Sequence, residues 1–403
     1  MNAILRGFEA STALEQAEAA RVAARIEQAN GDDADEEQTW LSNAPLRELV
    51  GHAREDVIGN ARDATAQMHE SGLVRINNCI STAAAAALLD HLDERLIEAR
   101  ANLAATPNDH GATKFIGNVR RPINRTDLKF EVLPPVAAAL AEALAPLRAV
   151  CSDVLGADAE LFELGAFISD PKAPRQGVHP DTQFTPDALA CSTLIALQDI
   201  DESMGPTEFL PGTHHAAAHT ALQTRTKRVV EPALTPAQLA AKQRARALAI
   251  LKGGGSQAEV PGAVDATTMG ARERLLRSTP RQLGTMRVGD AVMFDTRVLH
   301  CGGANTSSRR RVLFYFSFRV QGGHTPYGRD SLDEELQKRK LTLQESRVWL
   351  HRAQLSAYHL QQLDIAIRLS GGGCDVSTHP GRGASRSTAP AISSSADEIV
   401  VVS

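Results

Sequence analysis

His179 and Asp181 stand two residues apart in the segment QGVHPDTQF (176–184), and this spacing limits the folds open to the chain. On an extended strand, residues i and i+2 point to the same face, so both side chains could bind one metal ion. A third ligand must come from elsewhere, and the candidate is His300, at the end of GDAVMFDTRVLH (289–300). The fold must therefore bring together two segments that lie far apart in the sequence.

Two histidines and one carboxylate form the facial triad of non-heme Fe(II) oxygenases, which leaves positions open for a cosubstrate and dioxygen. A lone His–Asp pair on a strand is more often a structural hydrogen bond. Here the pair follows a strand and a proline-rich turn (170–177), His300 closes a second strand, and Arg311 begins the next one. His300 is expected to share a strand face with Val292, Phe294, Thr296 and Val298. These features together favour a metal site.

Arg311 is best interpreted from its strand, RRRVLFYFSF (309–318). One set of alternating residues is wholly apolar and suited to packing against helices: Val312, Phe314, Phe316 and Phe318. The other set is mixed and suited to lining a wet cavity: Arg311, Leu313, Tyr315, Ser317 and Arg319. Arg311 is therefore predicted to point inward and Arg310 outward. A buried guanidinium needs an anionic partner, which a dicarboxylate cosubstrate would supply in bidentate geometry.

The hydrophobic periodicity predicts helices first and then many short strands. Ser81 is the expected N-cap of a helix that runs to about residue 103, and a second helix is expected to follow Pro134 and Pro135 and to run to about residue 155. Strands are expected at 73–79, 161–170, 190–200, 207–210, 291–300 and 312–321. This order predicts an α+β fold with a mainly β core, built on a closed or sandwiched antiparallel sheet. The chain has no strand–GxGxxG–helix unit, so a doubly wound sheet is disfavoured.

Changes in composition divide the chain into expected regions. Residues 1–60 form a helical N-terminal extension, and residues 61–330 form the main domain. Within that domain, residues 216–281 are interpreted as an insertion near the metal site. Residues 331–370 are expected to be C-terminal helices. Residues 371–403 are rich in Gly, Ser and Pro and lack aromatic side chains, so this tail is predicted to be disordered.

Charge and cysteine content indicate the expected partners and compartment. The 43 basic and 48 acidic residues nearly balance, which argues against nucleic acid or an anionic membrane as a partner. The five cysteines are an odd number without a CxxC pair, which suits a reducing compartment. No signal peptide or membrane-spanning stretch is visible. A soluble, cytoplasmic protein with a small-molecule substrate is expected, and its oligomeric state is left open.

Four pieces, taken in order, resemble the phytanoyl-CoA dioxygenase (PhyH-like) family of Fe(II)/2-oxoglutarate oxygenases. They are HPD (179–181), MGPTEFLPGTH (204–214), GDAVMFDTRVLH (289–300) and Arg311. The upstream segment ESGLVRINNCISTAAAAALLDHL (70–92) also looks like the N-terminal opening of that family.

The resemblance covers about residues 60–320 and implies a double-stranded β-helix (jelly roll, cupin-like) with N-terminal helices packed on the major sheet. It implies that His179, Asp181 and His300 bind Fe(II) and that Arg311 binds the distal carboxylate of 2-oxoglutarate. Dioxygen would be the second cosubstrate, and a small molecule would be hydroxylated or otherwise oxidised, with succinate and CO2 as coproducts. Related halogenases lack the carboxylate ligand, so Asp181 favours hydroxylation-type chemistry.

Two other functional hypotheses stay open. A metal-dependent hydrolase or cupin-type enzyme could use the same triad, since zinc accepts these ligands with an open fourth position. The inward Arg311 argues against it, because a zinc-activated water needs no anchor for a dicarboxylate. A non-catalytic binding protein could also keep the fold, but the intact triad argues against lost turnover.

Further histidines and one cysteine lie near these motifs. His214 and His215 are candidate extra ligands, although the histidine of the PGTH segment is a loop residue in the resembled family. Four others are interpreted as ordinary surface or helix histidines: His219, His324, His351 and His359. Cys301 follows His300 directly, so its side chain is expected to point away from the site.

Several polar residues have expected supporting roles. Thr182 and Gln183 are candidates for hydrogen bonds that orient the metal ligands. Three residues of the last strand either line the pocket or simply fill the barrel: Tyr315, Ser317 and Arg319. Arg309 and Arg310 are expected to be solvated or paired with surface carboxylates.

Overall fold

A computed structural model describes residues 37–105, 116–117, 123–186, 189–224, 269–323, 332, 338 and 340–352. The chain divides into two compact units, residues 1–356 and 357–403, and every described residue belongs to the first. Several predicted regions lie outside the described residues: most of the N-terminal extension, residues 225–268 of the expected insertion, and the C-terminal tail. Among the described helices, none has both the length and the apolar composition needed to cross a membrane.

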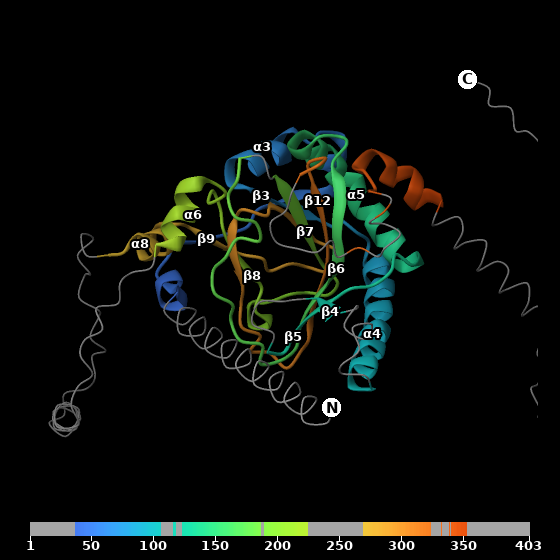
Figure 1. The fold of residues 1–403 in the computed structure, drawn as a ribbon, viewed down its shortest axis with the longest axis horizontal. Helices are drawn as coiled ribbons and strands as arrows, with labels where there is room; N and C mark the ends of the chain where they lie inside the picture. Colours follow the sequence, from blue (N-terminus) through green and yellow to red (C-terminus); the bar gives the residue numbers. More distant parts are fainter. Residues whose placement is uncertain are drawn as a thin grey trace, which may run out of the picture. The chain divides into compact units, whose positions relative to one another are not determined.

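Two β-sheets form the centre of the described fold (Figure 1). The strands of the larger sheet are β2 (Gly51–Ala53), β3 (Leu73–Asn77), β4 (Ile116–Gly117), β5 (Arg125–Leu128), β6 (Glu160–Ser169), β7 (Ala190–Ala196), β10 (Ala291–Asp295) and β12 (Arg311–Arg319). They follow the order β2-β3-β10-β7-β12-β6-β5-β4, with only the β2–β3 pair parallel among these eight described strands.

The smaller sheet contains β1 (Leu46–Arg47), β8 (Thr207–Leu210), β9 (Arg281–Leu283) and β11 (Leu299–Gly302). Their order is β1-β9-β8-β11, in which β1 and β9 are parallel and the other pairs are antiparallel. Helices surrounding large, mainly antiparallel sheets agree with the predicted mixed class. The antiparallel pairing also agrees with the expectation that the sheet is not doubly wound.

The helices are α2 (Arg54–Gly59), α3 (Arg62–Ser71), α4 (Thr82–Ala105), α5 (Pro134–Leu155), α6 (Ala216–Gln223) and α8 (Ala271–Ser278). Residues 37–42 and 343–352 are also helical. Ser81 is the predicted N-cap of α4, and its Oγ accepts a hydrogen bond of 3.1 Å from the backbone N–H of Ala84. The prolines at the start of α5 suit a first turn, where the backbone N–H has no helical partner.

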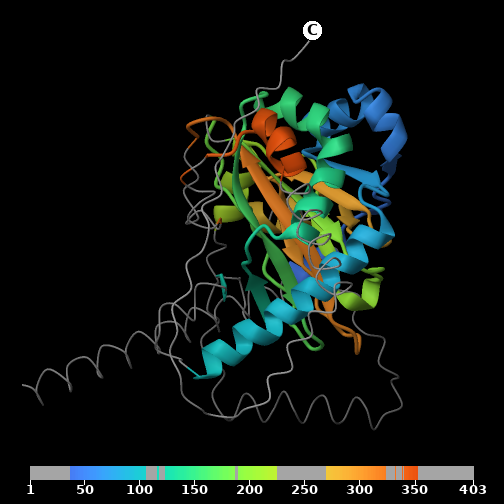
Figure 2. The same ribbon diagram turned by 90° about the vertical axis from the view of Figure 1, so that its right-hand side faces the viewer.

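The outer face of the larger sheet packs against α4 and α5. Its apolar core includes the four alternating β12 residues predicted to face helices: Val312, Phe314, Phe316 and Phe318. The buried stripe of α4 contributes Leu88, Leu92 and Leu96 to the same core. Figure 2 shows α4, in cyan, and α5, in green, lying across the strands. This packing confirms the predicted assignment of the two β12 faces.

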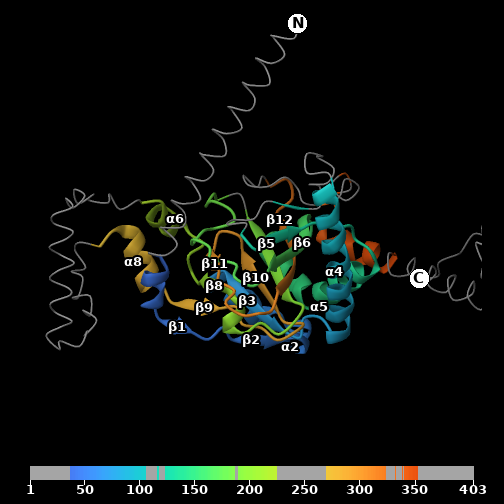
Figure 3. The same ribbon diagram turned by 90° about the horizontal axis from the view of Figure 1, so that it is seen from below.

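A second apolar core lies between the two sheets. It contains Leu73, Leu194, Phe209, Val292, Phe294, Leu313 and Tyr315, which come from strands of both sheets. In Figure 3 the strands of the smaller sheet lie between α8 on one side and the larger sheet on the other. The inner β12 face, which starts at Arg311, therefore borders this inter-sheet core.

A third core covers the outer face of the smaller sheet. It joins Leu41 of the helical segment 37–42 to Leu222 of α6, Leu276 of α8 and Leu299 of β11. Both ends of the expected insertion at 216–281 thus contribute described helices to this packing. Figure 1 shows α6 and α8 on the side of the sheets opposite to α4 and α5.

The predicted strand at 291–300 is wrong in one respect, because it is two strands in different sheets. β10 ends at Asp295 in the larger sheet, and β11 begins at Leu299 in the smaller one. A turn separates them, in which the Val298 N–H donates to the Asp295 carbonyl (2.8 Å) and the Arg297 N–H donates to the Asp295 carboxylate (2.9 Å). Asp295 therefore directs the crossover from one sheet to the other.

His179 and Asp181 do not lie on a continuous extended strand. His179 forms a single antiparallel bridge with His300, and the chain bends immediately afterwards. The N–H groups of Asp181 and Thr182 both donate to the carbonyl of Thr296, at 2.9 and 3.0 Å. The loop is thus fixed by the β10–β11 turn rather than by a strand ladder.

Candidate metal centre

The structure brings the three predicted ligands together. His179 Nε2 lies 3.9 Å from Asp181 Oδ1, and His300 Nε2 lies 3.5 Å from the same oxygen. One donor atom from each residue falls within 4.8 Å of the others. Both histidines are 7% exposed, whereas the Asp181 side chain is 44% exposed. Solvent therefore reaches this group of donors from the aspartate side.

Backbone carbonyls fix the tautomer of both histidines. His179 Nδ1 lies 2.8 Å from the Gly177 oxygen, and His300 Nδ1 lies 2.9 Å from the Val298 oxygen. A carbonyl oxygen can only accept, so each Nδ1 must carry the proton. Each Nε2 then presents a lone pair on the side of Asp181, which is the arrangement that metal-binding histidines use.

Backbone pairing also sets the distance between the two histidines. The N–H of each donates to the carbonyl of the other, both at 2.9 Å. The imidazole ring of His300 lies against Phe294 of β10 and Phe209 of β8, with ring centroids 5.1 and 6.1 Å apart. Because both rings belong to the inter-sheet core, His300 faces that core and cannot swing freely.

Arg311 lies at the start of the inner β12 face, as predicted, and is 3% exposed. Its Nη1 donates to the Gly205 carbonyl, and its Nη2 donates to Ser169 Oγ at 3.1 Å. Nε has no partner, and no carboxylate among the described residues pairs with this guanidinium. Burial, with a contribution from Arg125, lowers the pKa of Arg311 to about 9. A nearby anion would favour its charged form.

Tyr315, one of the candidate pocket residues, belongs to a polar group on the same face of the sheet, whose other members, Asp127 and Lys129, were missed from the sequence. The Tyr315 hydroxyl donates to Asp127 Oδ1 at 2.9 Å, and the Lys129 ammonium contacts both the tyrosine oxygen and Asp127 Oδ2, the latter at 2.9 Å. Phe167 stacks on the Tyr315 ring at 4.1 Å. Gly165 leaves room for this ring, because a Cβ there would lie 2.9 Å from the tyrosine oxygen.

Glu163 of β6 is a further missed residue. In the β6–β12 pairing it lies opposite Ser317, which is two residues from Tyr315 on the inner face of β12. Burial raises the pKa of Glu163 to about 7, although Lys129 and a hydrogen bond with Ser317 act in the opposite direction. The Asp181 carboxylate adds to the increase, which places Glu163 within electrostatic range of the metal group.

The remaining predicted residues have structural partners. His215 is the N-cap of α6, where its Nδ1 accepts from Ala218 N–H at 3.3 Å, and neither His215 nor His214 belongs to the metal group. Cys301 lies on the opposite side from His300, as predicted, in the third core. Arg310 pairs with Asp170 (2.6 Å) and Asp93 (3.1 Å) on the outside, also as predicted.

The other predicted supporting residues are also either paired or buried. Arg309 pairs with Asp201 at 2.5 Å in an exposed position. Ser317 Oγ lies 3.1 Å from Ser192 Oγ, and Arg319 lies 3.5 Å from Glu160. Gln183 accepts a hydrogen bond from Gln223 of α6 at 2.8 Å, and Thr182 is buried.

His219 lies on helix α6, as expected, but its imidazole is buried and links two parts of the site. Nδ1 accepts from the Phe184 N–H at 3.1 Å, and Nε2 lies 2.8 Å from the Arg297 carbonyl. Phe184 belongs to the loop that follows Asp181, and Arg297 belongs to the β10–β11 turn. Burial lowers the pKa of His219. Its neutral form therefore holds the aspartate loop against the turn.

The sequence profile of the phytanoyl-CoA dioxygenase (PhyH) family matches residues 68–313. This range contains the three candidate ligands and Arg311. No curated protein matches the sequence.

Several solved structures are similar to this chain. They include the non-heme α-ketoglutarate-dependent epimerase SnoN from nogalamycin biosynthesis, with 16% identity, TM-score 0.40, and coverage of 65% of this chain and 81% of that one. The non-heme α-ketoglutarate-dependent carbocyclase SnoK from the same biosynthesis has 16% identity, TM-score 0.40, and coverage of 71% and 92%. HygX from Streptomyces hygroscopicus, with nickel and 2-oxoglutarate bound, has 13% identity, TM-score 0.38, and coverage of 64% and 87%.

Proposed function

We propose, from the premise that the chain belongs to the phytanoyl-CoA dioxygenase family, that it is an Fe(II)- and 2-oxoglutarate-dependent oxygenase of a small molecule. The proposal rests on two features that border the same core. A group of two histidines and one aspartate, and a buried arginine with no carboxylate partner among the described residues, border the same inter-sheet core.

The donor set fits a non-heme iron ion. Two neutral imidazoles and one carboxylate provide three donors on one side of an ion and leave the other positions open. Thiolate ligands, which favour zinc or iron–sulfur clusters, are not part of the group. His179, Asp181 and His300 would hold the ion, and when bound, iron and 2-oxoglutarate supply the activation of dioxygen that oxidises the substrate.

Arg311 fits the distal carboxylate of the cosubstrate. A guanidinium that is almost fully buried is costly without an anion, and its remaining donor Nε has no partner. A carboxylate could accept two parallel hydrogen bonds from its planar fork. Arg311 would then orient the cosubstrate along the inner face toward the metal group, and the apolar inter-sheet core would exclude water.

The proposal includes finer expectations that follow from the family. The two sheets would form a double-stranded β-helix, with residues 61–330 as the catalytic domain. The presence of Asp181 supports hydroxylation or a related oxidation of a small molecule, with succinate and CO2 as coproducts. A cytoplasmic location is supported by four buried cysteines that are free thiols in the structure: Cys79, Cys151, Cys191 and Cys301.

The test is an anaerobic titration of 2-oxoglutarate into the Fe(II)-loaded protein, followed by the visible charge-transfer band of the chelated cosubstrate. We expect a saturable band in the wild type and none in His300→Ala. Arg311→Ala should require at least tenfold more 2-oxoglutarate, because a buried charge-assisted pair is lost.

Arg310→Ala is the matched control, because this neighbouring arginine points outward to Asp170 and Asp93. It should titrate like the wild type. A metal-replete wild type without a band would reject the oxygenase proposal and direct attention to zinc content and hydrolase assays.

A further inference from the structure

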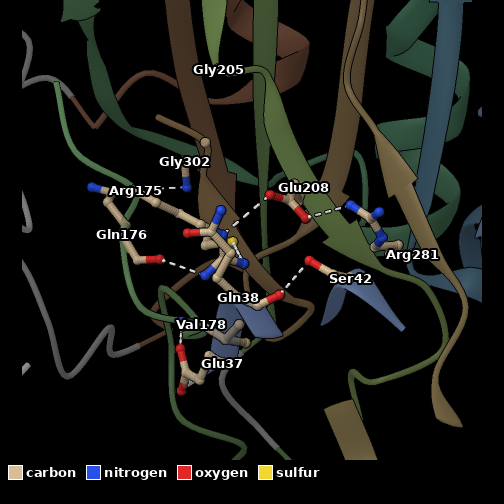
Figure 4. A network of polar contacts seen from close by, with 12 residues as sticks. Glu37, Gln38, Ser42, Arg175, Gln176, Val178, Gly205, Glu208, Arg281 and Gly302 are labelled. Carbon is tan, nitrogen blue, oxygen red and sulfur yellow. Dashed lines mark hydrogen bonds and ion pairs between the residues drawn. The ribbon is translucent and has the colours of Figure 1, made fainter. Parts of the chain in front are cut away.

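A network of charged side chains lies on the outer face of the smaller sheet, next to the loop that carries His179 (Figure 4). Glu208 of β8 lies 3.2 Å from Arg175 and 3.2 Å from Arg281. Glu37, from the helical segment 37–42, is part of the same region and is 0% exposed. This segment precedes residues 68–313, the region that matches the family profile.

The Glu37 carboxylate makes two contacts in this packing, one through each oxygen. Its Oε2 accepts a hydrogen bond of 2.7 Å from the backbone N–H of Val178, the residue directly before His179. Its Oε1 forms an ion pair with Arg272, on the first turn of α8. A buried carboxylate is costly unless it is paired and hydrogen-bonded, and these two contacts meet that requirement.

The Val178 contact completes the anchoring of the metal loop. On one side of it, Gln176 exchanges two hydrogen bonds of 2.9 Å with the backbone of Gly302. On the other side, His179 is paired with His300. Glu37 therefore fixes the backbone between two points that are attached to β11. Gly177, whose carbonyl orients the His179 ring, lies within this stretch.

We propose that Glu37 is a positioning residue of the metal centre. Its carboxylate fixes the backbone on the N-terminal side of His179. Because the same carboxylate pairs with Arg272, metal affinity also depends on the packing of segment 37–42 against α8. The metal part of this inference rests on the function proposed above. The positioning part rests only on the contacts that Glu37 makes with Val178 and Arg272.

Two substitutions test the proposal in the full-length protein. Glu37→Ala removes both contacts, and Glu37→Gln keeps the size of the side chain but removes its charge. Glu273→Gln is the matched control, because Glu273 is on the same helix as Arg272 and, among the described residues, forms its ion pair with Arg277, at 2.9 Å. Melting temperatures verify that each variant is folded.

The first measurement is hydrogen–deuterium exchange of peptides that cover residues 175–183 in metal-free protein. The second is the Mn(II) dissociation constant from the electron paramagnetic resonance signal of free Mn(II). We expect faster exchange and an approximately tenfold weaker Mn(II) affinity in Glu37→Ala, with a smaller change in Glu37→Gln. The control should stay within about twofold of the wild type for both quantities.

A folded Glu37→Ala with unchanged exchange and unchanged Mn(II) affinity would overturn the proposal. If Glu37→Ala does not fold, Glu37→Gln decides by the same two measurements. A wild type that binds no Mn(II) would instead contradict the proposed function, and the exchange data on metal-free protein would still decide whether Glu37 positions the loop.

Discussion

His219 uses both ring nitrogens, so protonation would break one of the two contacts that hold the Asp181 loop. Its pKa is lowered by burial, and the folded protein binds this proton less readily than the unfolded chain. The stabilisation is therefore complete above about pH 6.5 and is lost as the pH falls below that value. We predict that His219→Gln loses about 1–3 kcal/mol of unfolding free energy at pH 7.5, because its two partners are left poorly satisfied.

Urea unfolding of metal-free protein between pH 5 and pH 8 checks this prediction. The difference between wild type and His219→Gln should shrink as the pH falls. His351→Gln, which changes an exposed histidine, should follow the wild type at every pH. A constant difference across the range would show that His219 does not contribute to the pH dependence.

Glu163 has the opposite pH dependence. Because its pKa is raised to about 7, the folded protein retains a proton that the unfolded chain releases above about pH 4.3. Its contribution is full below the unfolded pKa and is lost as the pH rises through about 7. Relative to the wild type, Glu163→Gln should gain on the order of 2 kcal/mol between pH 5 and pH 8.

The same urea experiment, in metal-free protein, measures this gain. Glu55→Gln is the control, because its side chain is 78% exposed. A Glu163→Gln curve parallel to that of the wild type would place Glu163 in a solvated environment.

The role of a residue could be predicted where it belongs to a motif or to a strand in which polar and apolar side chains alternate. The inward direction of Arg311 followed from the two faces of its strand, and the structure confirms it. The same alternation could have found Glu163, which shares its parity with Gly165 and Ser169, whereas the alternate positions of β6 are mostly apolar. Glu37 could not be found in this way, because its partner Val178 is distant in sequence and contacts it only through tertiary packing.

Gly72 ends α3 at the point where the chain enters β3. Its φ of 77° is left-handed, and a Cβ there would lie 2.5 Å from Val298 Cγ2 and 2.6 Å from His214 Nδ1. We predict that Gly72→Ala costs about 2–4 kcal/mol, from the left-handed backbone and from overpacking of the β10–β11 turn.

Chemical denaturation of both glycine variants measures the effect of Gly72→Ala against a control. Gly59→Ala changes the last residue of α2, where no atom lies within 4 Å of the added Cβ. It should be neutral or stabilising by up to about 1 kcal/mol. Equal effects of the two substitutions would contradict the predicted crowding at Gly72.

Elements were predictable where local chemistry sets their ends. Ser81 and the pair of prolines at residues 134–135 located the starts of α4 and α5 correctly. The break after β10 was missed because the segment DTRV contains the β-favouring residues Thr296 and Val298. The available signal was Asp295, whose side chain accepts from the N–H two residues later, a typical turn arrangement.

At the scale of the whole molecule, ligand binding should stabilise the native state. A ligand that binds only the folded chain, at a hundred times its dissociation constant, adds about 2.7 kcal/mol. We predict that Mn(II) raises the melting temperature, that 2-oxoglutarate raises it further, and that EDTA reverses both increases. Differential scanning calorimetry measures the shifts.

Arg311→Ala should keep the increment from Mn(II) and lose most of the increment from 2-oxoglutarate. Arg310→Ala should keep both. A cosubstrate increment that is independent of Arg311 would remove this residue from the proposed binding site.

Sheet topology was predictable only as a class. Alternating segments indicate antiparallel strands, but β10 has neighbours from distant parts of the chain, β3 and β7, and the sequence does not specify such pairing. The crossover between the sheets is what brings His300 beside His179, and it depends on contacts that form only in the assembled fold.

The reciprocal backbone pairing of His179 and His300 determines when, during folding, the metal donors come together. These residues are joined by non-local contacts, and chains acquire such contacts late because closing a long loop is entropically expensive. A newly made chain would therefore lack the complete donor set until the two sheets have packed against each other. We expect metal loading to follow folding, so that the supply of iron sets how much of the folded protein carries metal.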